Sequence, residues 1–292
     1  TGLITVLFDG VSTLTSIGYS VFNGCTGVTS VSIPNTVTSI GYSAFHSCTG
    51  LITVLFDGVS TLTSIENYVF NGCTGLTSVS IPNTVTSIGT HAFQSCTGLI
   101  TVLFDGVSTL TSIGNNSFHS CTGITSIIIP DTVTTIDTSA FQSCTGLTSI
   151  IIPDTVTSIG SSAFHSCTGL KSLSITTINT PLTIGNMAFQ SCSDLTSVSI
   201  PYYISNYLSS SHWFLYCGQI KTVTFVTAGS DFTKTILNWW LGTGFYDSRL
   251  TINNIVMGTN FTSIGNSAFQ FRGYLTSVTI PNTVTSIGNS AF

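Results

Sequence analysis

The residue types that could carry chemistry in this 292-residue chain recur at fixed spacing, and cysteine shows the period most clearly. The nine cysteines follow one another at steps of 23 or 25 residues, each three residues after a phenylalanine: Cys25, Cys48, Cys73, Cys96, Cys121, Cys144, Cys167, Cys192 and Cys217. Thiols at one position of stacked repeats have Cα atoms about 5 Å apart, which a disulfide can accept. An odd number cannot all pair, and beside phenylalanine a free cysteine packs as a small hydrophobe. We therefore expect reduced, packed thiols, with bridges between coils as the alternative in an oxidising compartment.

The histidines and serines give no pattern typical of a catalytic or metal site. His46, His119 and His165 follow the phenylalanine, where other repeats carry Gln94, Gln142 and Gln190, so this position is predicted to be a solvated polar turn. These histidines lie two or three repeats apart, roughly 10 to 15 Å, which is too far to share a proton or a metal. Zinc needs converging ligands, and a Ser-His-Asp triad needs one singular site. The sequence predicts no enzyme, no metal and no cofactor.

Aspartate precedes glycine on every second repeat, at Asp9, Asp57 and Asp105. These acids are predicted to lie about 10 Å apart. Calcium requires six or more oxygens, and at that distance no two of them share an ion. Asp-Gly turn chemistry accounts for them better.

The unit that must position these residues reads AFQSCTGLTSIIIPDTVTSIG from Ala140 to Gly160. Leu147, Ile150 and Ile152 fall on one face of a short strand that ends at Pro153. In the next segment, 155–160, Val156 is predicted to point inward between outward threonines, and Gly160 to turn the chain. The alanine, phenylalanine and cysteine that follow then return to the core in one helical turn. A period of this length indicates a solenoid in which each unit forms one coil.

The letters I-P, V-x-x-I-G, A-F-x-x-C and L of this unit resemble the BspA-like leucine-rich repeats, over residues 1 to about 200 and again from about 259 to 292. The resemblance implies a β-rich leucine-rich-repeat solenoid of about 12 coils of 23 or 25 residues, with short strands and one helical turn per coil. It also implies an extracellular or cell-surface protein that acts by adhesion or protein–protein interaction. No catalytic residue comes with the family.

The regular pattern fails between residues 201 and 258, which divides the chain into 1–200, 201–258 and 259–292 within one solenoid. Exposed aromatics provide binding energy at low entropic cost. We take this segment as a candidate contact for a protein or matrix ligand; the alternative is that its rings fill the core of a degenerate coil. Its candidate residues are Tyr202, Tyr203, Trp213, Trp239, Trp240, Phe245 and Tyr246.

Hydroxyl side chains dominate the predicted surface. A T-x-T ladder repeats on seven successive coils: Thr13/Thr15, Thr36/Thr38, Thr61/Thr63, Thr84/Thr86, Thr109/Thr111, Thr132/Thr134 and Thr155/Thr157. Such a ladder resembles the threonine arrays of β-solenoid antifreeze proteins, so ice binding is an alternative function, although threonine is favoured on any solvated strand face. The outward positions of the other strand are nearly all serine, as at Ser30, Ser32, Ser78, Ser80, Ser149 and Ser197, which predicts a uniform spacer or a multivalent weak binder.

Charge and the chain ends complete the sequence-based expectations. Residues 1–170 hold seven acids and no lysine or arginine, and charged residues make up 5% of the chain, so nucleic acid is not an expected partner. No apolar stretch is long enough to span a bilayer.

The first residues and the last match consecutive parts of the unit, so head-to-tail stacking into a filament is possible; the alternative is a segment of a longer surface protein. Asn115 and Asn260 begin glycosylation sequons.

Overall fold

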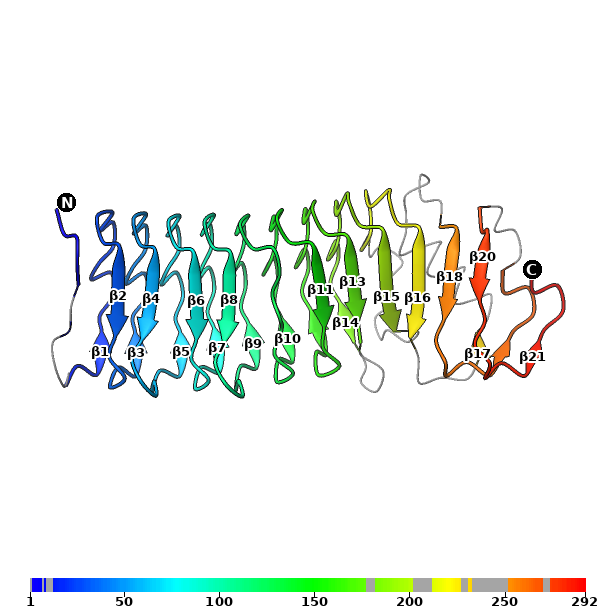
Figure 1. The fold of residues 1–292 in the computed structure, drawn as a ribbon, viewed down its shortest axis with the longest axis horizontal. Helices are drawn as coiled ribbons and strands as arrows, with labels where there is room; N and C mark the ends of the chain where they lie inside the picture. The colour runs from blue at the N-terminus through cyan, green and yellow to red at the C-terminus, as the bar shows by residue number, and fades with distance from the viewer. Residues whose placement is uncertain are drawn as a thin grey trace.

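The computed structural model describes residues 2–6, 8, 13–176, 182–201, 212–226, 231–232, 252–269 and 274–292. These residues form an elongated stack of coils in which every strand runs parallel to its neighbours (Figure 1). The predicted solenoid is confirmed.

One wall of the solenoid consists of the longer strands. They form a four-stranded sheet and a six-stranded sheet, and isolated bridges at Val6 and Ser126 mark further coils. The four strands are β2 (Ser30–Ile33), β4 (Thr53–Phe56), β6 (Ser78–Ile81) and β8 (Thr101–Phe104), and the six are β11 (Ser149–Ile152), β13 (Ser172–Ile175), β15 (Ser197–Pro201), β16 (Thr222–Val226), β18 (Asn254–Met257) and β20 (Ser277–Thr279).

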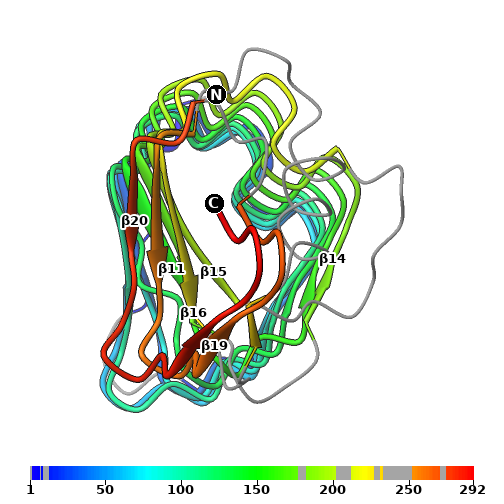
Figure 2. The same cartoon turned by 90° about the vertical axis from the view of Figure 1, so that its right-hand side faces the viewer.

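A second wall consists of short strands of two residues each. The end-on view shows β14 across the interior from the long strands (Figure 2). They form sheets of two, six and three strands: β1 (Ser16–Ile17) and β3 (Ser39–Ile40); β5 (Ser64–Ile65), β7 (Ser87–Ile88), β9 (Ser112–Ile113), β10 (Thr135–Ile136), β12 (Ser158–Ile159) and β14 (Thr183–Ile184); β17 (Asp231–Phe232), β19 (Ser263–Ile264) and β21 (Ser286–Ile287).

The third side of each coil is a series of tight turns, so the prediction of a helical turn was wrong. Within one coil, alternate amides bond differently: those of Ala163, His165 and Cys167 bond three residues back, to the carbonyls of Gly160, Ser162 and Phe164. The amides between them bond across to the next coil. Ser162 and Ser166 have φ of 56° and 59°, a left-handed conformation that interrupts an α-helix. Inter-coil bonding at every second amide therefore replaces helical bonding.

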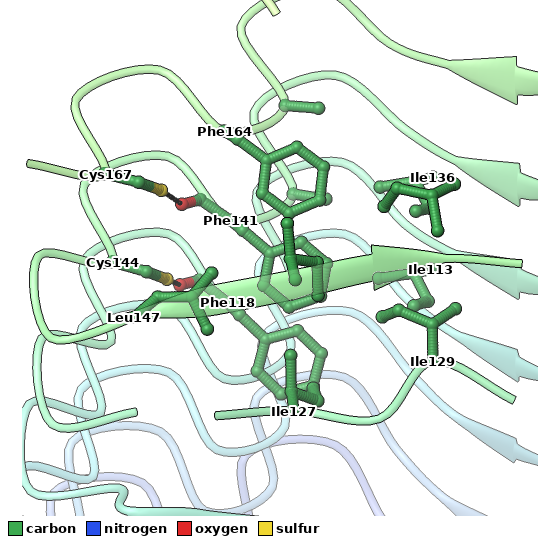
Figure 3. Packing of buried hydrophobic residues seen from close by; sticks show 14 of the residues in the cluster. Ile113, Phe118, Ile127, Ile129, Ile136, Phe141, Cys144, Leu147, Phe164 and Cys167 are labelled. Atoms are coloured by element: carbon green, nitrogen blue, oxygen red, sulfur yellow. Dashed lines mark hydrogen bonds between the residues drawn. The ribbon is translucent and has the colours of Figure 1, made fainter. Parts of the chain in front are cut away.

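The core is built from columns of identical side chains. Figure 3 shows Phe118, Phe141 and Phe164 stacked one above another, with isoleucines from both walls beside them. Successive ring centroids in this column lie 5.3 and 5.2 Å apart, and the rings are within 8° of parallel. Because the repeat places the same ring at the same position of each coil, the rings exclude water as one continuous stack.

Gly160 directly precedes the turn residues, and its backbone does not have the positive φ that would by itself require glycine. A Cβ atom at this position would collide with the backbone of Asp137 and Thr138 in the preceding coil. Glycine is needed here because two coils approach closely, and the spacing of the stack depends on it.

The aromatic segment forms part of the same solenoid where the structure describes it. β15 pairs with β16, and β16 pairs directly with β18. Thr222 and Asn254 are neighbours in this sheet although 32 residues separate them, against 23 or 25 elsewhere. β16 and β18 are therefore adjacent strands of the long-strand wall despite their greater separation in the sequence.

Candidate interaction surface

The cysteine column is buried and chemically quiet. Each thiol from Cys48 onward donates a hydrogen bond to the carbonyl oxygen of a phenylalanine in the preceding coil, as from Cys144 to Phe118 at 3.2 Å (Figure 3). All nine cysteines are free thiols, and only Cys25 is partly accessible. Burial raises the pKa of Cys96 and of Cys167 to about 12, so these thiols stay protonated at neutral pH.

The histidines form part of a polar row along the turns. The amide nitrogen of Gln94 lies 3.2 Å from Nδ1 of His119, and the amide of Asn71 donates to Gln94 at 2.9 Å. Desolvation by burial lowers the pKa of His119, with a smaller contribution from the charge of His91. Within the described residues no three His, Cys, Asp or Glu side chains gather closely enough to hold a metal ion. This row ties neighbouring coils together through side-chain hydrogen bonds.

The Asp-Gly pairs stand at bends that follow the long strands β4 and β8. Gly58 and Gly106 have φ of 54° and 52°, a conformation that glycine adopts without steric cost. The carboxylates of Asp57 and Asp105 accept short hydrogen bonds from Ser32 and Ser80 of the preceding coils. Asp9 lies outside the described residues.

Two of the aromatic residues near the irregular segment can be placed. Trp213 is only 1% exposed and stands where other coils have a buried alanine such as Ala188, so its ring fills the core. Tyr216, by contrast, is 53% exposed. The other predicted binding residues, Tyr202, Tyr203, Trp239, Trp240, Phe245 and Tyr246, lie outside the described residues.

The threonine ladder is present, and most of its hydroxyl protons are directed at backbone carbonyls of the preceding coil. The hydroxyl of Thr155 donates to the carbonyl of Val133 at 2.9 Å, and that of Thr134 donates to Thr111 at 3.2 Å. The same bond to the preceding coil occurs at most members of the ladder, including Thr36, Thr38, Thr61, Thr84, Thr86, Thr109, Thr111 and Thr157. The ladder therefore joins neighbouring coils by hydrogen bonds, and the groups that it presents to solvent are mainly methyl groups and oxygen lone pairs.

Thr15 and Thr63, like Thr13 and Thr132, are not among the described members whose hydroxyl donates to the preceding coil. Both residues are exposed, and each joins the ladder through its backbone carbonyl, which accepts the hydroxyl of Thr38 or of Thr86 at 3.1 Å. The reason is the local stacking. Thr15 precedes β1, the first strand of its sheet, and Thr63 precedes β5, which no ladder of the described residues joins to β3.

The outward face of the long strands is less uniform than predicted. Serines such as Ser32, Ser80 and Ser174 do point outward, but aliphatic side chains stand at the same register on other coils. Leu55, Leu103, Ile128 and Ile151 are 56 to 83% exposed, and we call these four residues the aliphatic row. The sequence contained the signal, because L or I follows V or I where the other coils have V-S-I.

A groove opens beside this row between β8 and the next coil. Val102, Leu103, Phe104 and Val107 line one side, and Ile128, Pro130, Asp131 and Thr132 the other, around a volume of about 370 Å³. The long-strand sheet is interrupted here: no ladder joins β8 to residues 126–129, and the next pairing is the bridge between Ser126 and Ser149. Backbone bonding to the coil of β8 resumes at Thr134, whose amide donates to Thr111.

A second row, made of aromatic rings of which Tyr19 and Tyr42 are exposed and Tyr68 and His91 partly buried, was not anticipated from the sequence. Tyr19 and Tyr42 stack at 5.3 Å, Tyr42 lies 5.1 Å from Tyr68, and Tyr68 lies 4.6 Å from the ring of His91. Tyr19 is 70% exposed. All four precede a cysteine by five or six residues, a shared position that could have indicated the row.

A family model described as the BspA type leucine rich repeat region matches residues 7–124, 111–238 and 241–292. Among solved structures, a leucine-rich repeat protein from Bacteroides ovatus ATCC 8483 is 24% identical over 99% of this chain and 84% of that chain, with a TM-score of 0.46. The T. pallidum leucine rich repeat protein is 24% identical over 66% of this chain and 78% of that one, with a TM-score of 0.48. A leucine rich cell surface protein from Faecalibacterium prausnitzii A2-165 is 23% identical over 94% and 86%, with a TM-score of 0.30. No curated protein matches the chain.

Proposed function

Because the chain belongs to the BspA-type leucine-rich repeat family, we propose that it is a non-catalytic module that binds other proteins, in adhesion or another protein–protein interaction, outside the cell or at its surface. Its ligand is a protein or matrix component.

The observation that carries this proposal is the aliphatic row. The large aliphatic side chains of Leu55, Leu103, Ile128 and Ile151 are exposed on the outer face of the long-strand wall, whereas inward neighbours such as Val54, Val102 and Ile150 are buried, so these four residues lie outside the core. Exposed apolar side chains gathered on one face are typical of an interaction site. The regular wall holds them at fixed positions, which lowers the entropic cost of binding.

The chemical groups of the described residues support a binding role over catalysis. The thiols are buried and protonated, and the ladder hydroxyls donate to backbone carbonyls. A nucleophile needs a base and an accessible substrate position. None of the described segments is a helix long and apolar enough to cross a membrane.

The test is binding of the purified chain to immobilised matrix proteins such as collagen and laminin, followed by biolayer interferometry. We expect saturable binding to at least one of them, and at least a tenfold loss when all four residues of the aliphatic row are replaced by serine, the residue that Ser32 and Ser80 provide at this register. The melting temperature of that variant should change little, because the four side chains are exposed.

A second variant separates the row from the irregular segment. Replacing Trp239 and Trp240 with alanine should leave binding intact if the row is the contact, and should weaken it if the aromatic segment is the contact. Absence of saturable binding to any protein of the panel would contradict the proposed function.

A further inference from the structure

Resting on the proposed function, we infer that the groove between β8 and the following coil receives an extended segment of a partner protein in which aliphatic residues alternate with lysine or arginine. Three observations on these coils lead to this partner: an interrupted sheet, a cluster of exposed aliphatic side chains, and exposed aspartates on coils that contain no lysine or arginine.

On the side of β8 that faces the next coil, the backbone groups make no ladder hydrogen bonds. Between residues 125–132 and the coil of β8, a stretch that the structure describes throughout, no backbone hydrogen bond forms. Elsewhere on this wall Ser78 to Ile81 pair residue by residue with Thr101 to Phe104. An unpaired strand edge is a template for an extended peptide, whose main chain supplies the missing hydrogen bonds. The edge therefore favours an extended segment over a folded surface.

The walls of the groove select aliphatic side chains. Leu103 is 56% exposed, Ile128 is 83% exposed and Val107 is 86% exposed, and all three line the same groove. A volume of about 370 Å³ lies at the lower end of ligand sites, so it accommodates a few side chains of a peptide. Ile151 continues the apolar surface onto the next coil.

The acids select the charge of the partner. Asp105 and Asp131 occur on the two coils that border the groove, each directly after the long-strand segment of its coil, and both residues are exposed. Residues 1–170 contain no lysine or arginine, so neither coil carries such a side chain beside the two aspartates. A partner with basic side chains beside its aliphatic ones fits this potential, whereas an acidic segment is repelled.

The chain offers a matched control for the groove. Val59 holds the same position after β4 that Val107 holds after β8, and it is similarly exposed at 81%. The coil that follows β4 still pairs with it through Ser78 and Val79, and it carries Ser80 where the coil after β8 carries Ile128. Val59→Ser removes the same side chain from a place where the sheet remains joined.

The test uses the whole chain and fluorescein-labelled eight-residue peptides, measured by fluorescence anisotropy. The first peptide alternates valine and lysine, the second alternates valine and glutamate, and the third places four valines before four lysines. We expect saturable binding of the first, at least tenfold tighter than that of the other two and weakened by high salt. Ile128→Ser and Val107→Ser should each weaken it at least fivefold, Asp131→Asn should weaken it and reduce the salt dependence, and Val59→Ser should have no effect.

Several results would overturn the inference. If Ile128→Ser binds the valine–lysine peptide as tightly as the unaltered protein does, the peptide is attracted by charge alone. If the block peptide binds with equal affinity, the groove does not recognise an extended alternating segment. A concentration-dependent dimer in light scattering that Ile128→Ser abolishes would assign the groove to a second copy. If the chain binds a matrix protein but none of the peptides, this inference fails while the proposed function stands. If the peptides bind and no matrix protein does, the proposed function fails while this inference stands.

Discussion

The thiol of Cys167 donates a hydrogen bond to the carbonyl oxygen of Phe141 at 3.1 Å, and the two residues belong to successive coils. The same carbonyl also accepts the backbone amide of Cys144 at 3.2 Å, so the thiol is its second donor. It also joins the cysteine column to the phenylalanine column. Eight of the nine cysteines, from Cys48 to Cys217, are buried in this arrangement, and all nine are free.

Thiol labelling should therefore distinguish one cysteine from the others. With a small alkylating reagent at pH 8, we expect Cys25 to react in the folded protein and the remaining eight to react only after unfolding, because burial keeps them inaccessible and raises the pKa of thiols such as Cys96 to about 12. Mass spectrometry of chymotryptic peptides locates the label, because residues 1–170 contain no lysine or arginine at which trypsin could cut. Rapid labelling of Cys121 or Cys144 in the native state would contradict the packing described.

The threonine ladder should contribute to stability in proportion to its bonds. Thr155→Val removes the hydrogen bond to Val133 at nearly constant volume, and we expect a loss of about 0.5 to 1.5 kcal/mol in the free energy of unfolding. Thr132→Val is the matched control, since Thr132 holds the same ladder position one coil earlier and is exposed. Urea denaturation compares the two. Equal losses would show that the hydroxyl of Thr155 does not bond between coils.

At turn positions with positive φ, the effect of a substitution on stability should depend on the shape of the new side chain. Ser143 has φ of 60°, so Ser143→Val should destabilise the fold by about 1 to 2 kcal/mol, because a β-branched residue is strained in this conformation. Ser143→Gly should be tolerated, since glycine adopts positive φ without that cost. Thermal unfolding of both variants provides the measurement. The opposite order would favour a helical turn here.

Stability should fall as the pH drops below the ordinary histidine range. Desolvation lowers the pKa of His119 and of His165 from 6.5, so the unfolded chain takes up protons near pH 6.5 before the folded chain does. Each proton then favours unfolding, by less than about 1 kcal/mol per residue because both side chains remain partly solvated. The double variant His119→Gln, His165→Gln carries the residue that Gln142 provides at this position, and it should lose less stability between pH 7.5 and 5.5 than the unaltered protein. An unchanged pH dependence would show that these two histidines do not titrate differently on folding.

Much of the fold could be predicted from the repeat. The spacing of phenylalanine and cysteine determines the coil, and the inward positions Leu147, Ile150 and Ile152 are buried as the alternation indicated. The turn was the exception, because A-F-x-x-C has helical spacing. Only the stacked coils supply the acceptors that let alternate amides, such as that of Phe164, bond outside their own coil to Ala188.

For the candidate sites too, the sequence determined one part and the tertiary structure decided the rest, and the reason is physical. The sequence alone determined the periodicity, the hydrophobic columns and the absence of lysine and arginine over the first 170 positions, because these depend only on residue types and their order. Tertiary structure decided which side chains remain in solvent: Trp213 is taken into the core, while Leu103 and Ile128 are left exposed. It also decided where the sheet opens after β8, since pairing between two coils depends on whether both backbones follow the same path, and residue types within either coil do not determine that.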